Sequence, residues 1–344
     1  KGIAGECLRT GKIVNVPDAY ADDRFNRDID RVTGFRTRNL LTFPLRSHDG
    51  SLVGTLQALN RTDGPFGPRE EELALTLSSL AGVAVQRQLL INEYAEKQKL
   101  ERDLAVARTI QQATLPRSVP TARGYDFAGF NEPADATGGD TYDYFALPDG
   151  RVVLTIADAT GHGIGPALVV TQYRSMVRAL LLDEVDPVTV MERINTLFGE
   201  DLPEGMFVTS FLGVLDPAAG EITYVSAGHG PLLHHQRAGD RRSEHAATTI
   251  PLGVLPSLEV KACDVIRLAP GDTFLLMTDG FFEWADASDE QFGTQRIFEV
   301  VADQPQASAA DLIGTIHAKL HAFAGDTPQK DDLTAVVIRR TGVS

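Results

Sequence analysis

The sequence predicts a mixed α/β (α+β) protein in which one long helix joins two domains. At roughly 150 residues per domain, a chain of 344 residues is expected to form two domains. Beyond residue 120, apolar runs of strand length alternate with helical patterns, as is typical of α/β domains. Between Glu70 and Thr114 there is no proline and only one glycine, which predicts a continuous helix. We place the domains at residues 1–68 and 121–340, with the helical linker at 69–115.

Composition excludes several classes of protein and partner. Hydrophobic residues make up 43% of the chain, enough to bury cores, so the chain is not disordered. The net charge of −15 has the wrong sign for binding nucleic acid or an anionic membrane, and we expect neither as a partner. The only cysteines, Cys7 and Cys263, indicate a reducing compartment and two buried thiols. Residues 1–6 lack the layout of a signal peptide, so we expect a cytoplasmic protein.

Strand and turn patterns dominate the first domain. Residues 12–17 and 40–45 are short apolar runs, each stopped by a proline. The second run is joined to residues 52–59 through Asp49-Gly50, a dipeptide typical of hairpin turns. The sequence therefore predicts a β-hairpin in this domain.

The linker helix is expected to pair with a second copy of itself. Apolar residues recur about every 3.5 positions in its first half and, in shifted register, in its second half. These residues are Leu73, Leu77, Leu80, Ala84, Ile91, Leu100, Leu104 and Ala107. Because this seam is too thin to stabilise an isolated helix, it predicts a homodimer. Polar residues interrupt the seam from Gln88 to Gln98, which fits a signalling joint and a plain linker equally well.

The second domain follows Leu115-Pro116, which ends the helix. Strands are predicted at residues 151–157, 206–215, 221–227, 272–278 and 333–339. Helices are predicted at residues 165–182, 187–198, 295–302 and 308–323. The second domain is therefore expected to be a single α/β unit.

Aspartates lie at the ends of these strands or in turns beside glycine. They are Asp140, Asp158, Asp279, Asp331 and Asp332. An acid at a strand end is held rigidly, and a neighbouring glycine lets a metal or phosphate approach the backbone. Several such carboxylates brought together would form a hard-oxygen site for Mg²⁺ or Mn²⁺, and two such ions can activate water for attack on phosphorus. Each motif alone is an ordinary turn or solvated loop.

The order and spacing of six motifs make the pattern specific. They are Gly138-Gly139-Asp140-x-Tyr142-Asp143, Asp158-x-x-Gly161-His162-Gly163, residues 207–216, Ala227-Gly228-His229, Thr278-Asp279-Gly280 and Asp331-Asp332-Leu333-Thr334. This set resembles the SpoIIE/RsbU-type branch of the PPM (PP2C-like) serine/threonine phosphatases. The resemblance implies an αββα sandwich with two divalent metal ions, Mn²⁺ or Mg²⁺, at one edge.

The resemblance also implies a role for each candidate residue. The implied metal ligands are the carboxylates of Asp140, Asp158, Asp279 and Asp331 and the backbone carbonyl of Ala159. The first two would bridge or flank the metals, and all four aspartates are the predicted catalytic residues. Asp332 would lie behind these ligands, and Asp143 would support its loop.

Four histidines are given structural roles. His162 and His229 lie in glycine turns, and the resemblance makes them structural, with a direct catalytic role as the alternative. His234 and His235 would face opposite sides of a strand, which disfavours joint metal ligation. We expect both of these at the surface.

The implied mechanism is direct hydrolysis of phosphoserine or phosphothreonine by metal-activated water, without a phospho-enzyme. The implied substrate is a phosphorylated regulatory protein, such as an anti-sigma-factor antagonist of the STAS type. Neither cysteine begins the Cys-x5-Arg motif of a cysteine phosphatase. A catalytically inactive module that binds a signalling partner is one alternative. A hydrolase of small phosphate esters is another, and it would need a deeper, basic pocket.

Motifs in the first domain resemble the C-terminal half of a GAF domain. They include Gly2-Ile3-Ala4-Gly5, residues 14–20, residues 37–41 and the Asn60-Arg61, Phe66, Glu70-Glu71 pattern. The resemblance implies a partial GAF sensor that acts on the phosphatase through rotation or dimer geometry of the linker. The last pattern is mainly a structural tie, so a small-molecule ligand of this domain stays open.

Overall fold

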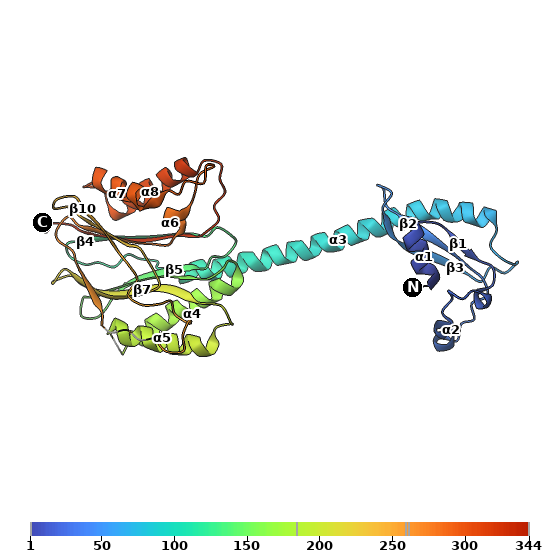
Figure 1. Cartoon of the computed structure of the whole chain (residues 1–344), viewed down its shortest axis with the longest axis horizontal. Coiled ribbons are helices and arrows are strands. Elements are labelled where there is room, and N and C mark those ends of the chain that lie inside the picture. Colours follow the sequence, from blue (N-terminus) through green and yellow to red (C-terminus); the bar gives the residue numbers. More distant parts are fainter. Residues whose placement is uncertain (1, 184, 259, 261, 343–344) are drawn as a thin grey trace. The chain divides into compact units, whose positions relative to one another are not determined.

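The computed structural model describes residues 2–183, 185–258, 260 and 262–342, so Lys1 of the N-terminal segment lies outside the described residues. The chain forms two compact units, Lys1–Glu101 and Arg102–Ser344. Helix α3 (Pro68–Thr114) begins in the first unit and ends in the second (Figure 1). The prediction of one continuous helix from residue 70 to 114 is confirmed.

The first unit contains a three-stranded antiparallel sheet in the order β1-β2-β3. Its elements are α1 (Gly2–Thr10), β1 (Val14–Val16), the 3-10 helix η1 (Ala19–Ala21), α2 (Arg27–Thr33), β2 (Leu40–Arg46) and β3 (Leu52–Leu59). The predicted hairpin is confirmed: Gly50 has a φ of +83° and donates its N–H to the carbonyl of Ser47 at 3.0 Å. The expectation that Pro44 stops its strand is wrong, because β2 continues through Pro44 to Arg46. The Pro44 carbonyl accepts a hydrogen bond from the hydroxyl of Ser78 on α3.

The first part of α3 packs closely on this sheet. Ala74 and Ser78 are buried against it. Gly82 is the one glycine between residues 70 and 114, and a Cβ there would lie 2.0 Å from the carbonyl oxygen of Arg46. Glycine is therefore required where the helix crosses the end of β2.

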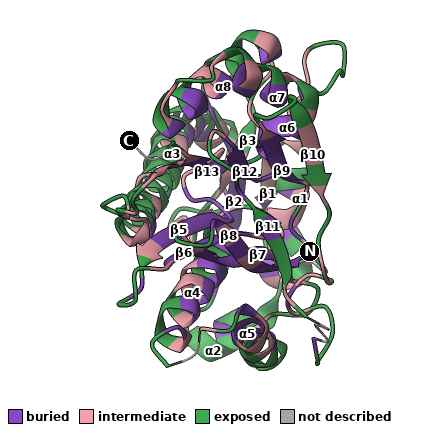
Figure 2. Ribbon diagram, turned by 90° about the vertical axis from the view of Figure 1, so that its left-hand side faces the viewer, coloured by how far each residue is buried: buried purple, intermediate pink, exposed green. Residues whose placement is uncertain are grey.

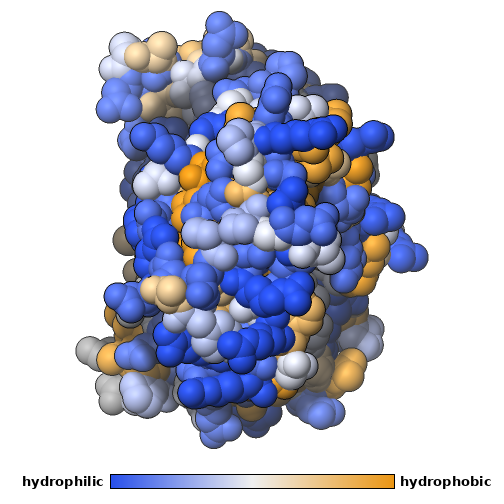
Figure 3. Space-filling model, turned by 90° about the vertical axis from the view of Figure 1, so that its right-hand side faces the viewer, coloured by the Kyte–Doolittle hydropathy of each residue, from blue (hydrophilic) through white to orange (hydrophobic). Residues whose placement is uncertain are grey.

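Much of the apolar surface of α3 stays exposed. Leu73, Leu77 and Leu80 are 56%, 55% and 69% exposed. By length and composition alone, α3 could cross a membrane: one 18-residue window has a mean hydropathy of 1.3, and 17% of it is buried. Figure 3 shows hydrophobic side chains at the surface among hydrophilic ones. This helix therefore carries an apolar face for which the described residues provide no cover.

The second unit contains two five-stranded sheets. Their strands are β4 (Tyr125–Glu132), β5 (Asp140–Ala146), β6 (Val152–Ala159), β7 (Val208–Asp216), β8 (Glu221–Ala227), β9 (Leu232–Gln236), β10 (Arg241–His245), β11 (Asp264–Arg267), β12 (Thr273–Met277) and β13 (Leu333–Arg340). One sheet has the order β10-β9-β12-β13-β4 and the other β11-β8-β7-β6-β5, and the neighbouring strands pair antiparallel.

Helices cover the outer face of each sheet. They are α4 (Ile164–Leu180), α5 (Pro187–Asp201), α6 (Gly280–Glu283), α7 (Gly293–Asp303) and α8 (Ala309–Ala324). Helices α4 and α5 pack on the β5–β8 side, and α6, α7 and α8 pack on the other sheet (Figure 1). Residues such as Phe211 and Phe274 fill the layer between the sheets. Figure 2 shows buried strands between helices with exposed outer faces, which is the expected αββα sandwich.

Strands with polar residues were the ones that pattern reasoning missed. In the second unit the five predicted strands and four predicted helices are present, but β4, β5, β9, β10, β11 and α6 were not predicted. In the first unit, where strands and turns were expected, α1, η1 and α2 were not predicted. The surface placement of His234 and His235 is wrong: they are 4% and 6% exposed because β9 lies inside its sheet, between β10 and β12. Their partners are Asp272 at 3.4 Å and Asp240 at 2.7 Å. Cys7 is buried as expected, whereas Cys263 is only partly buried.

Candidate metal centre

Two of the candidate aspartates face each other across neighbouring strands. Asp140 is the first residue of β5, and its direct cross-strand partner on β6 is Asp158. Side chains directly opposite each other in an antiparallel pair project from the same face with their Cβ atoms about 5 Å apart. The strand register therefore brings these two carboxylates together.

The other candidates meet at the end of the second sheet. Asp279 follows β12, and Asp331 and Asp332 precede β13. Because β12 and β13 are antiparallel, with Met277 opposite Ala335, the end of one strand lies beside the start of the other. The backbone N–H of Thr278 donates to the Thr334 carbonyl at 3.0 Å and fixes this junction.

Hydrogen bonds connect the two sheets at this edge. The Thr278 hydroxyl donates to Oδ2 of Asp140 at 2.7 Å. The carboxylate of Asp332, which is 7% exposed, accepts from the backbone N–H groups of Ala134 at 2.8 Å and Asp140 at 3.3 Å. Asp332 is therefore engaged in holding the Asp140 segment against the opposite sheet.

Glycines permit the close approach of these segments. A Cβ at Gly280 would lie 2.1 Å from the backbone oxygen of Asp332, and one at Gly138 would lie 2.3 Å from its Oδ2. A Cβ at Gly139 would lie 2.7 Å from the carbonyl oxygen of Ala159. Gly280 beside Asp279 and the Gly138-Gly139 pair before Asp140 are thus packing requirements of the site.

The electrostatics of the cluster suit divalent cations. Burial, followed by the charges of Asp158 and Asp332, raises the pKa of Asp140 well above its ordinary range. Burial and the nearby carboxylates Asp279, Asp331 and Asp332 raise the pKa of Asp158 to about 8. Burial and Asp331 raise the pKa of Asp279 to about 6. Clustered carboxylates disfavour one another's ionisation unless positive charge is supplied.

An unpartnered atom points to the same conclusion. Oδ1 of Asp279 is buried and has no hydrogen-bond partner among the described residues. A buried carboxylate oxygen without a donor is costly. Because Mg²⁺ and Mn²⁺ prefer oxygen ligands, these carboxylates and the Ala159 carbonyl are a suitable donor set for them.

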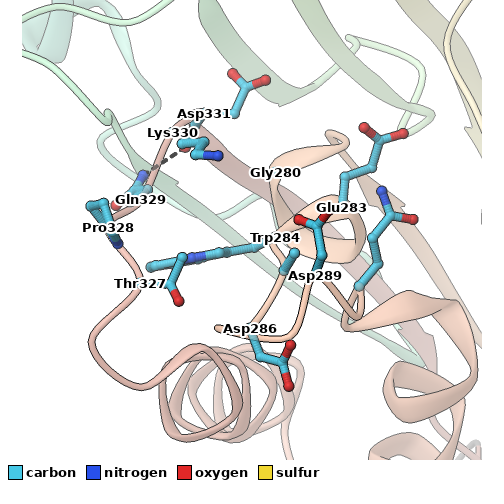
Figure 4. Close-up of a pocket in the computed structure, with 12 residues that line it drawn as sticks. Gly280, Glu283, Trp284, Asp286, Asp289, Thr327, Pro328, Gln329, Lys330 and Asp331 are labelled. Carbon is cyan, nitrogen blue, oxygen red and sulfur yellow. Dashed lines mark hydrogen bonds between the residues drawn. The ribbon is translucent and has the colours of Figure 1, made fainter.

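Asp331 differs from the other candidates in being exposed. Its Oδ1 accepts from the N–H of Asp332 at 2.8 Å. It lines a cavity of about 520 Å³ together with Glu283, Trp284 and Lys330 (Figure 4). Asp331 thus lies where the aspartate cluster meets an open cavity.

Two of the remaining sequence candidates, Asp143 and His162, pair with other residues, and the third, His229, is buried. Asp143 is fully buried and forms ion pairs with Arg174 at 2.9 Å and Arg178 at 2.6 Å. The His162 side chain is 86% exposed and lies 3.1 Å from Asp135. His229 is buried, and burial lowers its pKa to about 4.

Two contacts at the site lay outside the sequence prediction. One is the Thr278 hydroxyl on Asp140, for which the Thr-Asp-Gly motif was an available signal. The other is the side chain of Gln111 near the end of α3, which donates to the Gly138 carbonyl at 2.6 Å and accepts from the Gly138 N–H at 3.2 Å. A polar residue on a long helix gives no sequence signal for such a contact.

Comparison with known families decides the assignment. Residues 148–341, more than half of the chain, match the profile of the family described as Stage II sporulation protein E (SpoIIE). The chain belongs to the SpoIIE family. Residues 1–85 match the GAF domain profile. Both resemblances predicted from the motifs, to SpoIIE-type phosphatases and to GAF domains, are confirmed.

Individual relatives are distant. IcfG of Synechocystis sp. is 25% identical over 301 residues, which cover 80% of this chain and 47% of the relative. Phosphoserine phosphatase RsbU of Bacillus subtilis is 26% identical over 246 residues, covering 71% of this chain and 72% of RsbU. The solved SiaA-PP2C domain of Pseudomonas aeruginosa is 25% identical, with a TM-score of 0.62, covering 71% of this chain and 98% of that domain. The SpoIIE-family chain described here thus spans about half the length of IcfG, and its PP2C-like fold is shared with SiaA.

Proposed function

We propose that the protein is a metal-dependent serine/threonine phosphatase that hydrolyses phosphoserine or phosphothreonine on a regulatory protein, under control of its GAF domain. The observation that carries the proposal is the convergence of the aspartates at one edge of the sandwich, with a buried oxygen of Asp279 that has no donor among the residues the structure describes. Family membership and the name of the relative RsbU, a phosphoserine phosphatase, support the same reaction.

Each residue has a distinct part in the proposed chemistry. Asp140, Asp158, Asp279 and Asp331, with the carbonyl of Ala159, would hold two divalent ions, Mn²⁺ or Mg²⁺. When bound, such ions activate water and neutralise charge on the phosphoryl group. Thr278 orients the Asp140 carboxylate through its 2.7 Å hydrogen bond, and Asp332 fixes the backbone of Asp140.

The cavity beside Asp331 favours a protein substrate over small phosphate esters. Lys330 is the one basic residue among the described residues that line it, whereas Glu283, Asp286 and Asp289 are acidic. A free nucleotide or sugar phosphate would find little positive charge there apart from the metals. A phosphorylated residue on a folded regulatory protein, such as an anti-sigma-factor antagonist of the STAS type, needs only the metals at its phosphate.

Control by the GAF domain is proposed to pass through α3. Its exposed leucines would pair with those of a second copy and form a homodimer. At the other end, Gln111 contacts Gly138, two residues before Asp140.

In the first unit, a cavity of about 270 Å³ bounded by Ile3, Leu40 and Gln57 is the proposed place for a small-molecule signal. The cytoplasmic location expected from the sequence stays a prediction.

A direct assay tests the proposed activity. Hydrolysis of a phosphoserine peptide and of para-nitrophenyl phosphate would be measured with Mn²⁺, Mg²⁺ or EDTA. We expect metal-dependent turnover that Asp158→Asn and Asp279→Asn abolish and that Asp303→Asn retains, because Asp303 is an exposed residue at the end of α7. Binding of a signalling partner without turnover in any metal would instead favour the alternative, a catalytically inactive module.

A further inference from the structure

A second group of metal-binding side chains lies outside the aspartate centre. Glu132 is the last residue of β4, and His317 and His321 lie one turn apart on α8. One ligand atom from each lies within 4.8 Å of the other two. Residues four apart share one face of a helix, which explains why both imidazoles reach the same strand end.

The separations fit the coordination sphere of one ion. Nε2 of His317 is 3.2 Å from Oε2 of Glu132 and 3.1 Å from Nε2 of His321. Ligand atoms bound to a tetrahedral zinc at about 2.0–2.2 Å are about 3.3–3.6 Å from one another. The two separations from His317 are therefore just below the zinc ligand range, and the third, between Glu132 and His321, is within 4.8 Å.

Hydrogen bonding alone does not satisfy this arrangement well. Nε2 of His317 faces both a carboxylate oxygen and another imidazole nitrogen, and it carries either one proton or one lone pair. As a donor it must divide one proton between two acceptors, and as an acceptor it leaves the carboxylate without a donor. A single cation would accept a lone pair from all three atoms.

Aromatic rings hold the two imidazoles in place. The ring centroids of Phe130 and His317 are 4.9 Å apart, and those of Trp284 and His321 are 5.0 Å apart. The side chains of His317 and Glu132 are 26% and 40% exposed, so an ion can enter from solvent and keep a water ligand. The site is thus oriented on one side and open on the other.

We propose that Glu132, His317 and His321 form a zinc site separate from the aspartate centre. Two imidazole nitrogens and one carboxylate favour Zn²⁺, whereas an all-oxygen centre favours Mg²⁺ or Mn²⁺. The site is linked to the cavity, because Gln329 donates its side-chain N–H to the carbonyls of both Glu132 at 3.2 Å and Asp331 at 2.8 Å. Trp284, which packs on His321, also lines that cavity (Figure 4). Bound zinc would therefore restrain the cavity at Gln329 and at Trp284.

Zinc and cobalt titrations test the proposal in a chain whose aspartate centre is weakened. In the Asp158→Asn, Asp279→Asn double variant, we expect one equivalent of Zn²⁺ to bind in competition with a chromophoric chelator. Co²⁺ should give the visible absorption of a four-coordinate site. It should also quench Trp284, the single tryptophan of the chain.

Further substitutions in that background locate the ion. His317→Ala and Glu132→Gln should each weaken Zn²⁺ binding at least tenfold, since loss even of an outer partner of a metal ligand costs about 10–100-fold. His48→Ala, at an exposed histidine of the first unit, should leave binding unchanged. Melting curves in EDTA establish that each variant folds. The proposal would be overturned if His317→Ala and Glu132→Gln bound zinc as tightly as the parent double variant does. It would also be overturned if the parent double variant bound no zinc.

Discussion

The side chain of Gln111 on α3 and the backbone of Gly138 form a pair of hydrogen bonds, one in each direction. Gln111 is 9% exposed, so this amide contact is sheltered from water. Gly138 in turn is so close to Asp332 that no side chain would fit between them. The end of the linker helix therefore contacts the segment that positions Asp140.

Replacing Gln111 tests whether this contact supports the metal centre. Gln111→Ala removes two hydrogen bonds, a loss of about 1–3 kcal/mol in the packing of the Gly138 segment. We expect a higher Mn²⁺ concentration for half-maximal hydrolysis of a phosphoserine peptide. Gln112→Ala, at the adjacent exposed position, is the matched control, and identical Mn²⁺ dependence of the two variants would contradict the idea.

An alanine at Gly280 should disrupt the site without adding or removing a charge. Its Cβ would lie 2.1 Å from the backbone oxygen of Asp332, so the segment before β13 must move. We expect loss of phosphatase activity and of tight Mn²⁺ binding. Gly314→Ala on α8 is the control, because no atom lies within 4 Å of its Cβ position and alanine favours the helix. Full activity of Gly280→Ala would show that the close approach is dispensable.

The exposed face of α3 should govern oligomeric state. Leu80 is 69% exposed, and Leu80→Glu places a charge on the predicted seam. We expect the variant to be monomeric by light scattering coupled to size exclusion, while the parent is a dimer. Val32→Glu, at an 87% exposed residue of α2, should remain dimeric. A parent that is monomeric at every concentration would exclude pairing through α3.

Helix rotation can be tested by insertion near Gln98. One added residue rotates everything beyond it by roughly 100° and seven added residues by about 20° net. If signals pass by rotation, the first insertion should change basal phosphatase activity and the second should largely restore it. Equal activity and equal dimerisation for the two insertions would count against a rotational relay.

Burial of His229 makes a specific contribution to acid sensitivity. Its pKa is about 4 in the folded chain against an ordinary 6.5, so between these pH values the unfolded chain binds a proton that the folded chain does not. The contribution of His229 to the free energy of unfolding is therefore complete above pH 6.5. It decreases as the pH falls, and about 2 kcal/mol has been lost at pH 5. His229→Gln removes that loss, so the difference in unfolding free energy from the parent should be smaller at pH 5 than at pH 7.5. Denaturant titrations at both values measure it, with His48→Gln as the control; an equal difference at both would refute the assignment.

The motifs predicted much of this architecture because they are local. Thr278-Asp279-Gly280 and Asp331-Asp332 each combine a strand end, an acid and a backbone constraint within a few residues. The unbroken helix could be predicted for the same reason, since the absence of proline is visible in the sequence. The polar strand β5 was missed because Asp140 and Asp143 resemble loop residues until Asp158 and two arginines are placed beside them.

The sequence by itself determined the long helix, the family and the identity of the candidate aspartates, since these depend on residue type and spacing along the chain. Only the tertiary structure decided which polar residues share a site. Gln111 lies 27 positions from Gly138, and Glu132 lies 185 positions from His317. Strand register and helix packing bring such pairs into contact, and neither can be read from a residue's near neighbours.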